Sequence, residues 1–340
     1  MPIIREYSSY RGRRPRGNML LAVLLVLVIL AALSVLLLQR YIVYDASGTP
    51  TLDLPWLQGG EEAPETLPPL EDFELIIQAP PADETSTETA EWSVLELPSP
   101  LTEDVWQQAQ GEASADAVAV TLKDSTGTVW YDSAAAVSDA VVLTEDSSTL
   151  LAEITGGALH SVARIHCFPD SKAAGHDVEG KGLKDTNGYI FYDGNNRQWL
   201  DPGKTEARAY LCALAAEAAA LGFDEVLLSN IGYPAEGRLD QIVSAAGEDG
   251  RAANIEAFLK EMRLALDAYE LRLCVELPES VLLEGSEETS ALVLSKIAPQ
   301  VNGIYVRAPQ SRREALAAAL TAAAPDLSLV LLPAGEAQTP

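Results

Sequence analysis

The feature that most constrains the fold is a repeated alternation, after Trp92, of short apolar segments with stretches of helical periodicity. Parallel strands are buried on both faces and read as short apolar runs, and each needs a crossover, usually a helix, before the next strand. Seven segments have this character: Ser93–Pro98, Ala117–Asp124, Val162–Asp170, Asp224–Asn230, Leu271–Pro278, Asn302–Pro309 and Leu327–Pro333. The alternation predicts an α/β fold with a parallel sheet or barrel.

Three of the intervening segments predict helices. Residues 251–269 place apolar side chains on one face at helical spacing, namely Ile255, Phe258, Leu259, Met262, Leu266 and Tyr269. Residues 204–221 show the same periodicity and stop before Gly222, the residue expected just past a helix end. Ser311 and Glu314 have the spacing of a capping box before a third helix.

The number of units points to a barrel. Seven β/α units within residues 92–336 come close to a (β/α)₈ TIM barrel, which takes about 250 residues. Either the apolar segment 73–79 (FELIIQA) supplies the eighth strand, or the barrel is open or truncated at its C-terminal end.

A membrane anchor is predicted at residues 19–40. Met19 to Leu38 has Ser34 as its only polar side chain, and as a helix it would span about 30 Å, enough to cross the hydrocarbon. Residues 1–18 carry five arginines and one glutamate, which predicts a cytoplasmic N-terminus and an extracytoplasmic C-terminal domain. The apolar run is longer than that of a secretory signal and no small-residue cleavage site follows it, so an uncleaved anchor is favoured.

Residues 41–91 have the composition of a disordered, acidic linker rich in Pro, Thr and Glu, with no Lys or Arg. The whole chain has 23 Lys and Arg against 50 Asp and Glu, a net charge of -27. This excess of acid argues against a nucleic-acid partner, because no basic surface is available to bind phosphates. The oligomeric state is not indicated.

Neither a disulfide framework nor a metal site is predicted. The three cysteines are odd in number and widely spaced, and they are interpreted as small core residues. No two of the three histidines lie at ligand spacing with a cysteine or an acid. We therefore expect no metal and no cofactor.

Several motifs occur in order between Ala117 and Gly237. They are KDSTGTVWYDS (residues 123–133), ARIHCFPD (163–170), RQWLDP (197–202) and GFDEVLLSNIGYP (222–234). Together they resemble a family of uncharacterised bacterial glycoside hydrolase-like domains, distantly similar to the α-amylase type of TIM barrel. The resemblance covers about half of the barrel well, and it implies a carbohydrate-related function.

The chain departs from the family at its polar positions. Ser229 stands where the family usually carries an aspartate at the end of the fourth strand, and Gly232 where it usually carries an arginine. Thr121 stands where the second strand usually ends in an aspartate. Glycosidases need two carboxyl groups at the scissile bond, so the resemblance implies that one catalytic member is lost.

Four other acids follow predicted strands, where a barrel presents side chains to its pocket: Glu96, Asp124, Asp170 and Glu276. Glu276 and Asp170 are the candidate catalytic residues. A shift of one residue in the strand would turn Glu276 toward the outer helices instead. A pair of these acids facing each other at about 5 to 9.5 Å would favour catalysis.

Five further residues are candidates for binding substrate: Arg164, Ser229, Asn230, Tyr305 and Trp199. Arg164 lies on an otherwise apolar strand, where it either binds a substrate oxygen or forms an ion pair with an acid inside the barrel. Trp199 ends a long loop, 171–200, whose aromatic residues suit sugar stacking and whose Gly and Asn residues equally suit hairpin turns.

Three functions are compatible with these observations. The first is a degenerate barrel that binds cell-envelope polysaccharide or serves an envelope assembly. The second is an active glycoside hydrolase with rearranged catalytic carboxylates. The third is an unrelated interaction module, which an exposed apolar patch away from the barrel mouth would favour.

Overall fold

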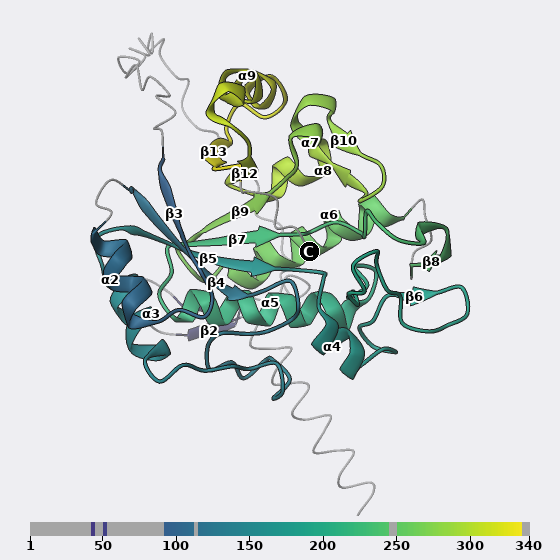
Figure 1. Ribbon diagram of the computed structural model, residues 1–340, viewed down its shortest axis with the longest axis horizontal. Coiled ribbons are helices and arrows are strands. Elements are labelled where there is room, and N and C mark those ends of the chain that lie inside the picture. Colours follow the sequence, from purple (N-terminus) through teal and green to yellow (C-terminus); the bar gives the residue numbers. More distant parts are fainter. Residues whose placement is uncertain (1–41, 45–49, 53–91, 112–114, 245–249, 335–340) are drawn as a thin grey trace, which may run out of the picture. The chain divides into compact units, whose positions relative to one another are not determined.

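The computed structural model describes residues 42–44, 50–52, 92–111, 115–244 and 250–334 (Figure 1). The predicted basic segment, the anchor at 19–40 and the strand candidate at 73–79 lie outside these residues. None of the helices in the described part of the chain has the length and hydropathy that a bilayer span requires.

Two short strands lie in the segment predicted to be a disordered linker. β1 (Ile42–Tyr44) and β2 (Pro50–Leu52) pair antiparallel in a unit of their own. A composition that disfavours a packed core does not prevent local strand pairing, and the linker at 41–91 stays a prediction. The rest of the linker lies outside the described residues.

Residues 92–334 contain a seven-stranded parallel sheet whose strands follow chain order in space (Figure 1). The strands are β3 (Val94–Leu97), β4 (Ala117–Lys123), β5 (His160–His166), β7 (Glu225–Ser229), β9 (Arg272–Glu276), β12 (Gly303–Arg307) and β13 (Ser328–Leu332). Six of them fall within predicted apolar segments and β5 begins two residues before its own, so the predicted parallel sheet is confirmed.

The sheet curls but does not close. Glu96 of β3, at one edge, binds Arg307 of β12, one strand from the other edge, and this contact requires strong curvature. Among the described residues, however, no strand pairs β3 with β13. The fold is an incomplete barrel, which is the open form of the predicted TIM barrel.

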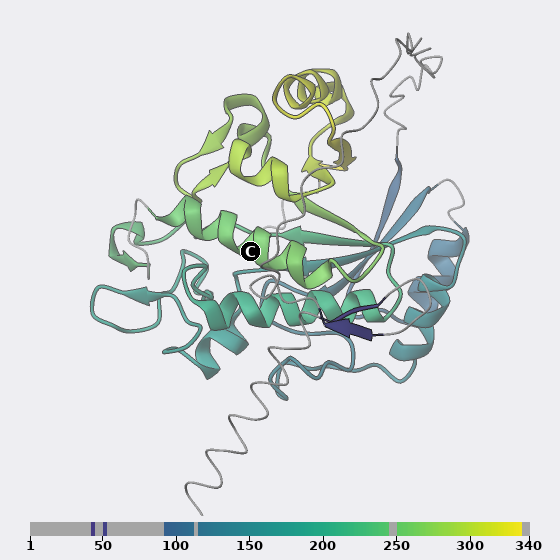
Figure 2. The same cartoon turned by 180° about the vertical axis from the view of Figure 1, so that it is seen from behind.

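The two faces of the sheet have separate cores. Residues of the inner face alternate along each strand and form a small apolar cluster: Ala117, Ala119, Val162, Leu227, Cys274, Tyr305, Val330 and Leu332. The outer face packs against helices in a larger cluster. Figure 2 shows α5 (Thr205–Ala220) and α6 (Arg251–Leu266) side by side on this face.

The three predicted helices are present, with two differences in detail. α5 ends beside Gly222, whose φ of +91° is the left-handed conformation expected past a helix end. Tyr269 lies beyond the end of α6, so only the other five members of its apolar face are buried on the helix. The capping box is wrong: α9 (Arg313–Ala323) follows a 3₁₀ turn at Gln310–Arg312, and this turn, which contains Ser311, leaves no extended N-cap residue.

The remaining helices are α2 (Glu103–Gly111), α3 (Ser147–Thr155), α4 (Ser171–His176), α7 (Glu279–Glu284) and α8 (Leu294–Ile297). Two small antiparallel pairs lie in the loops that follow the strands: β6 (Lys184–Asp185) with β8 (Ile242–Val243), and β10 (Ser286–Glu287) with β11 (Leu292–Val293). These loops bring segments distant in sequence to the carboxyl ends of the strands, where the catalytic sites of parallel barrels are found.

Candidate functional site

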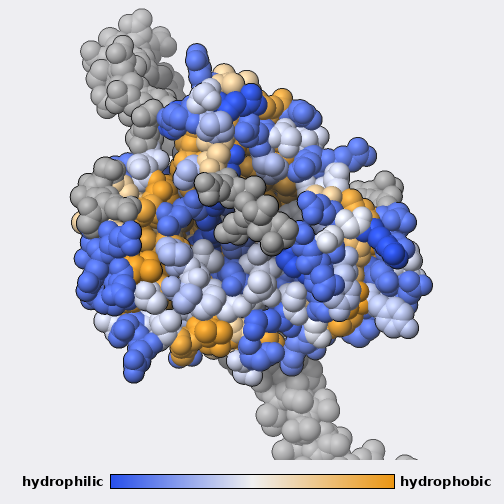
Figure 3. Space-filling model, viewed as in Figure 1, coloured by the Kyte–Doolittle hydropathy of each residue, from blue (hydrophilic) through white to orange (hydrophobic). Residues whose placement is uncertain are grey.

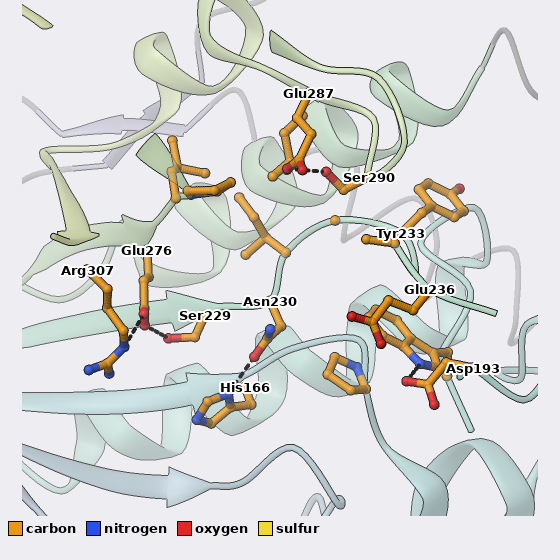
Figure 4. Close-up of a pocket in the computed structure, with 18 of the residues that line it drawn as sticks. His166, Asp193, Ser229, Asn230, Tyr233, Glu236, Glu276, Glu287, Ser290 and Arg307 are labelled. Atoms are coloured by element: carbon orange, nitrogen blue, oxygen red, sulfur yellow. Dashed lines mark hydrogen bonds and ion pairs between the residues drawn. The ribbon is translucent and has the colours of Figure 1, made fainter. Parts of the chain in front are cut away.

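A cavity of about 630 Å³ lies at the carboxyl ends of the strands (Figure 4). Strand-end residues that line it are His166, Ser229, Asn230, Glu276 and Arg307, and loop residues include Asp193, Arg197, Trp199, Tyr233, Glu236, Glu279, Glu287 and Ser290. The volume is within the range of small-molecule and sugar sites. Its position is the one predicted from the strand ends.

Glu276 is at the centre of the strand-end contacts. Its Oε2 accepts a hydrogen bond from Ser229 Oγ at 2.6 Å, and its Oε1 accepts one from Arg307 Nε at 2.8 Å (Figure 4). The side chain therefore faces the cavity rather than the outer helices. Two donors on its oxygens hold the carboxylate as a hydrogen-bond acceptor.

Arg307 joins Glu276 to a second carboxylate. The Nη atoms of Arg307 donate to both oxygens of Glu96, at 2.6 and 2.8 Å. One guanidinium thus spans the two acids, which places their nearest oxygens at most about 8 Å apart. This upper bound is compatible with the separation of a glycosidase pair, but a cation lies between the two carboxylates.

Arg164 is the second arginine that contacts both Glu96 and Glu276. It forms ion pairs with Glu96 and, at 3.5 Å, with Glu276, and it is almost fully buried. It does not line the cavity, so the structure has the ion pair inside the barrel rather than a contact to substrate. Burial by itself would raise the pKa of Glu96, but hydrogen bonds and charges from Arg307 and Arg164 outweigh burial and lower it.

His166 and Asn230 form a neutral pair beside the acids. Nδ1 of His166 lies 2.6 Å from Oδ1 of Asn230, whose φ of +53° turns the backbone out of β7 into the loop. Burial lowers the pKa of His166, and the charges of Arg164 and Lys123 lower it further, against the opposing effect of the Asn230 hydrogen bond. The imidazole is thus neutral at neutral pH and available for hydrogen bonding.

The loop after β5 contributes one wall, built around Asp193. This buried carboxylate accepts hydrogen bonds from Trp199 Nε1 and Arg197 Nε, both at 3.0 Å. Burial would raise its pKa, but these donors and backbone N–H groups lower it. Trp199 is only 7% exposed, so little of its ring is open for a sugar to stack on.

Besides Arg164 and Glu96, three further candidate residues lie outside the cavity. Asp170 is fully buried, caps α4 through the backbone N–H of Lys172 and Ala173, and pairs with Lys123 at 3.1 Å. The expected catalytic position of Asp170 is therefore wrong, because its carboxylate is taken up by the N-terminus of α4 and by Lys123 and does not reach the cavity. Asp124 accepts hydrogen bonds within its own turn, and Tyr305 lies in the inner apolar cluster.

Two strand-end residues of the cavity, Arg307 and His166, were not among the predicted site residues. Arg307 ends β12 just as Glu276 ends β9, and the same barrel rule would have identified it. His166 was weighed only as a metal ligand. Glu236, Glu279 and Glu287 reach the cavity from loops, and no local sequence pattern marks them. In the described residues, no group of three or more His, Cys, Asp or Glu side chains could hold a metal ion.

Comparisons with solved structures show distant likenesses in fold. The glycoside hydrolase domain of PgaB (BpsB) from Bordetella bronchiseptica is 13% identical, with 68% of this chain and 80% of that chain covered and a TM-score of 0.48. A hypothetical protein from Ruminiclostridium thermocellum is 23% identical over 53% of this chain and 96% of its own, with a TM-score of 0.45. The glycoside hydrolase domain of PelA from Pseudomonas aeruginosa is 15% identical over 68% and 78%, with a TM-score of 0.38.

No curated protein matches the chain. A family model described as "Putative glycosyl hydrolase domain" matches residues 102–306, which include Arg164, Ser229 and Glu276 but not Glu96 or Arg307. Because this match covers more than half of the sequence, the chain belongs to that family of glycosyl hydrolase-like domains.

Proposed function

We propose that the domain binds a cell-envelope polysaccharide in the strand-end cavity and does not cleave it. In this proposal the predicted anchor at 19–40 holds the domain outside the membrane. The observation that carries the proposal is the contact between Ser229 and Glu276, at the strand end where the resembled family has an aspartate.

The chemistry of glycoside cleavage supports a binding role. Retaining and inverting enzymes both need one carboxyl group to donate a proton and another to act as nucleophile or base. Ser229 is 2% exposed and donates its hydroxyl proton to Glu276, so this position has no carboxylate to stabilise a developing positive charge on the sugar. Both oxygens of Glu276 accept hydrogen bonds from neighbouring side chains, Ser229 and Arg307.

The cavity retains groups that suit sugar hydroxyls. Asn230, His166, Ser290 and the Arg307 guanidinium all line it, and they supply both donors and acceptors. Binding requires only such complementary hydrogen bonds and exclusion of water. The loss of one carboxylate is therefore compatible with retained affinity.

An active glycosyl hydrolase with rearranged carboxylates is the second candidate. It is favoured by the proximity of Glu96 and Glu276, which share Arg307. Catalysis by this pair requires Arg307 to leave the space between them when substrate binds. In that case Glu276→Gln lowers turnover by about a hundredfold or more, the scale expected for loss of general acid–base catalysis.

The purified full-length protein tests these alternatives on a panel of neutral and charged oligosaccharides. We expect binding of at least one oligosaccharide without release of shorter products. Ala235→Trp, at an exposed position in the cavity lining, should abolish binding, whereas Ala322→Trp, on the exposed face of α9, should not. Cleavage that Glu276→Gln removes would establish the hydrolase instead, and binding unaffected by Ala235→Trp would place the sugar elsewhere.

A further inference from the structure

The charges that line the cavity are unbalanced toward acid. Five carboxylates line it, those of Asp193, Glu236, Glu276, Glu279 and Glu287, against the two guanidinium groups of Arg197 and Arg307. A cavity with this lining repels anionic ligands, and the net charge of -27 on the chain adds to the repulsion over longer distances.

Three of the five acids already have a cation. Asp193 pairs with Arg197 at 3.0 Å, Glu276 with Arg307 at 2.8 Å, and Glu279 with Arg312 at 2.8 Å. Both cavity arginines are therefore engaged by acids. No cation of the described residues pairs with the remaining two carboxylates, Glu236 and Glu287.

Each of these two carboxylates accepts a hydrogen bond from a neutral side chain. Glu287, half-buried on β10, accepts a hydrogen bond from Ser290 Oγ at 2.8 Å. Glu236, exposed on the loop after β7, accepts one from Asn195 Nδ2 at 3.3 Å. Figure 4 shows them on different sides of the cavity, with Tyr233 on the wall between them. A chain of sugars entering the cavity passes both.

We infer that the ligand is a polysaccharide of amino sugars with free, protonated amines. This inference rests on the proposed function and names the class of polymer that the same cavity takes. An ammonium group has three donors and a positive charge, so it satisfies a carboxylate that Ser290 or Asn195 satisfies only in part. An N-acetyl group is neutral and leaves both carboxylates uncompensated, and uronate or phosphate polymers are repelled.

The test compares matched oligomers by titration calorimetry with the full-length protein. The probes are the β-1,4-linked glucosamine hexamer, its fully N-acetylated counterpart and an oligogalacturonate of the same length. We expect the glucosamine hexamer to bind about tenfold more tightly than the N-acetylated one, by the addition of two partly exposed ion pairs, and the oligogalacturonate not to bind. The preference should weaken at high salt.

Matched variants locate the effect. Glu287→Gln and Glu236→Gln should each weaken binding of the glucosamine hexamer about threefold to fivefold and leave the N-acetylated hexamer unchanged. Glu288→Gln and Asp240→Asn make the same charge change at exposed neighbours outside the cavity and should have no effect.

The outcomes separate the inference from the function on which it rests. Equal affinity for the two hexamers, or an effect of Glu288→Gln as large as that of Glu287→Gln, overturns the inference and leaves the sugar-binding function in place. If neither hexamer nor any other oligosaccharide binds, the proposed function fails as well.

Discussion

At the scale of single residues, the contact between Ser229 and Glu276 decides what a restored acid would do. Ser229→Asp places a second carboxylate against Glu276, where Ser229 Oγ lies 2.6 Å from a carboxylate oxygen. Two carboxylates in contact, one at a buried position and one partly exposed, repel each other when both are ionised, so one keeps its proton in the folded protein at a pH where the unfolded chain loses it. We expect a loss of about 2 kcal/mol or more at neutral pH and no gain of hydrolysis.

The sign of the pH dependence makes this prediction specific. A carboxyl pKa raised in the folded state lowers stability as pH rises above about 4, the unfolded value. Thermal unfolding of Ser229→Asp should therefore show a larger deficit at pH 8 than at pH 5, whereas Ser229→Asn should show the same deficit at both. A variant as stable as the wild type at pH 8 would contradict the burial of this contact.

Gly232 shows why the arginine of the resembled family cannot simply be restored. A Cβ atom at this position would lie 2.8 Å from both the Cβ and the carbonyl oxygen of Ser290. Backbone cannot yield as a flexible side chain can, so Gly232→Arg must displace the loop that carries Ser290. The close approach of the two loops thus leaves no space for a side chain at position 232.

The lowered pKa of Glu96 makes the stability of the protein depend on pH in the acid range. Because Arg307 and Arg164 lower the pKa of Glu96 in the folded protein, its contribution to stability is present above the ordinary value of 4.5 and is lost as pH falls through the lowered pKa. Arg307→Gln should lower the unfolding free energy by about 2 kcal/mol at pH 7. It should also reduce the stability lost between pH 6 and pH 3, as measured by urea unfolding.

The control for this prediction is Arg312→Gln, which breaks a partly exposed pair with Glu279. It should lower the unfolding free energy by less than about 1 kcal/mol and leave the loss of stability between pH 6 and pH 3 unchanged. If the wild type and Arg307→Gln lose the same stability between pH 6 and pH 3, Arg164 alone lowers the pKa of Glu96.

At the scale of elements, the strands were predictable and the site only in part. The central strands are buried on both faces, so their apolar runs are visible without knowledge of the fold. Glu276 followed from its place at the end of such a run. Asp170 also follows a predicted strand, but only the structure shows that its carboxylate caps α4. Glu236 and Glu287 reach the cavity through loops whose paths depend on tertiary contacts, which local periodicity does not encode.

The junction of β4, β5 and α4 predicts a structural role for Asp170. Its carboxylate is the counter-charge of Lys123, and both side chains are fully buried. Asp170→Asn preserves a helix cap but leaves the ammonium without its anion, and we expect a loss of about 3 kcal/mol or more in urea unfolding. Lys123→Met in the same chain should recover part of it.

Asp177→Asn is the matched control at the other end of α4, where a partly exposed pair with Lys181 should contribute less than about 1 kcal/mol. If Asp170→Asn folds as stably as the wild type and yet abolishes turnover on an active glycan, the catalytic assignment for Asp170 would be restored.

At the scale of the whole molecule, charge and surface favour the sugar-binding domain over the interaction module. Figure 3 shows hydrophilic and hydrophobic residues interspersed over the face seen in Figure 1. One apolar groove of about 520 Å³ lies beside α2 and α3, lined by Trp106 and Ile154 among others. Nothing in the described residues identifies a segment or partner that covers it. The cavity at the strand ends, by contrast, has the polar lining that sugars need.

The predicted membrane topology can be tested by cysteine labelling because the three native thiols are buried. Cys167, Cys212 and Cys274 are buried; burial raises the pKa of Cys212 to about 12 and raises the pKa values of the other two thiols as well. None should react with a membrane-impermeant maleimide at neutral pH. A cysteine introduced at a single exposed position therefore reports its own side of the membrane.

Asp326→Cys, at an exposed position before β13, should be labelled in intact cells, whereas Ser8→Cys, within the arginine-rich segment, should be labelled only after permeabilisation. The reason is that arginines flanking an apolar span are retained on the cytoplasmic side. Labelling of the wild type would show that the native thiols open to solvent and would invalidate the comparison. Protection of Asp326→Cys in intact cells, with labelling on lysis, would place the domain inside the cell and remove the envelope polysaccharide from its possible ligands.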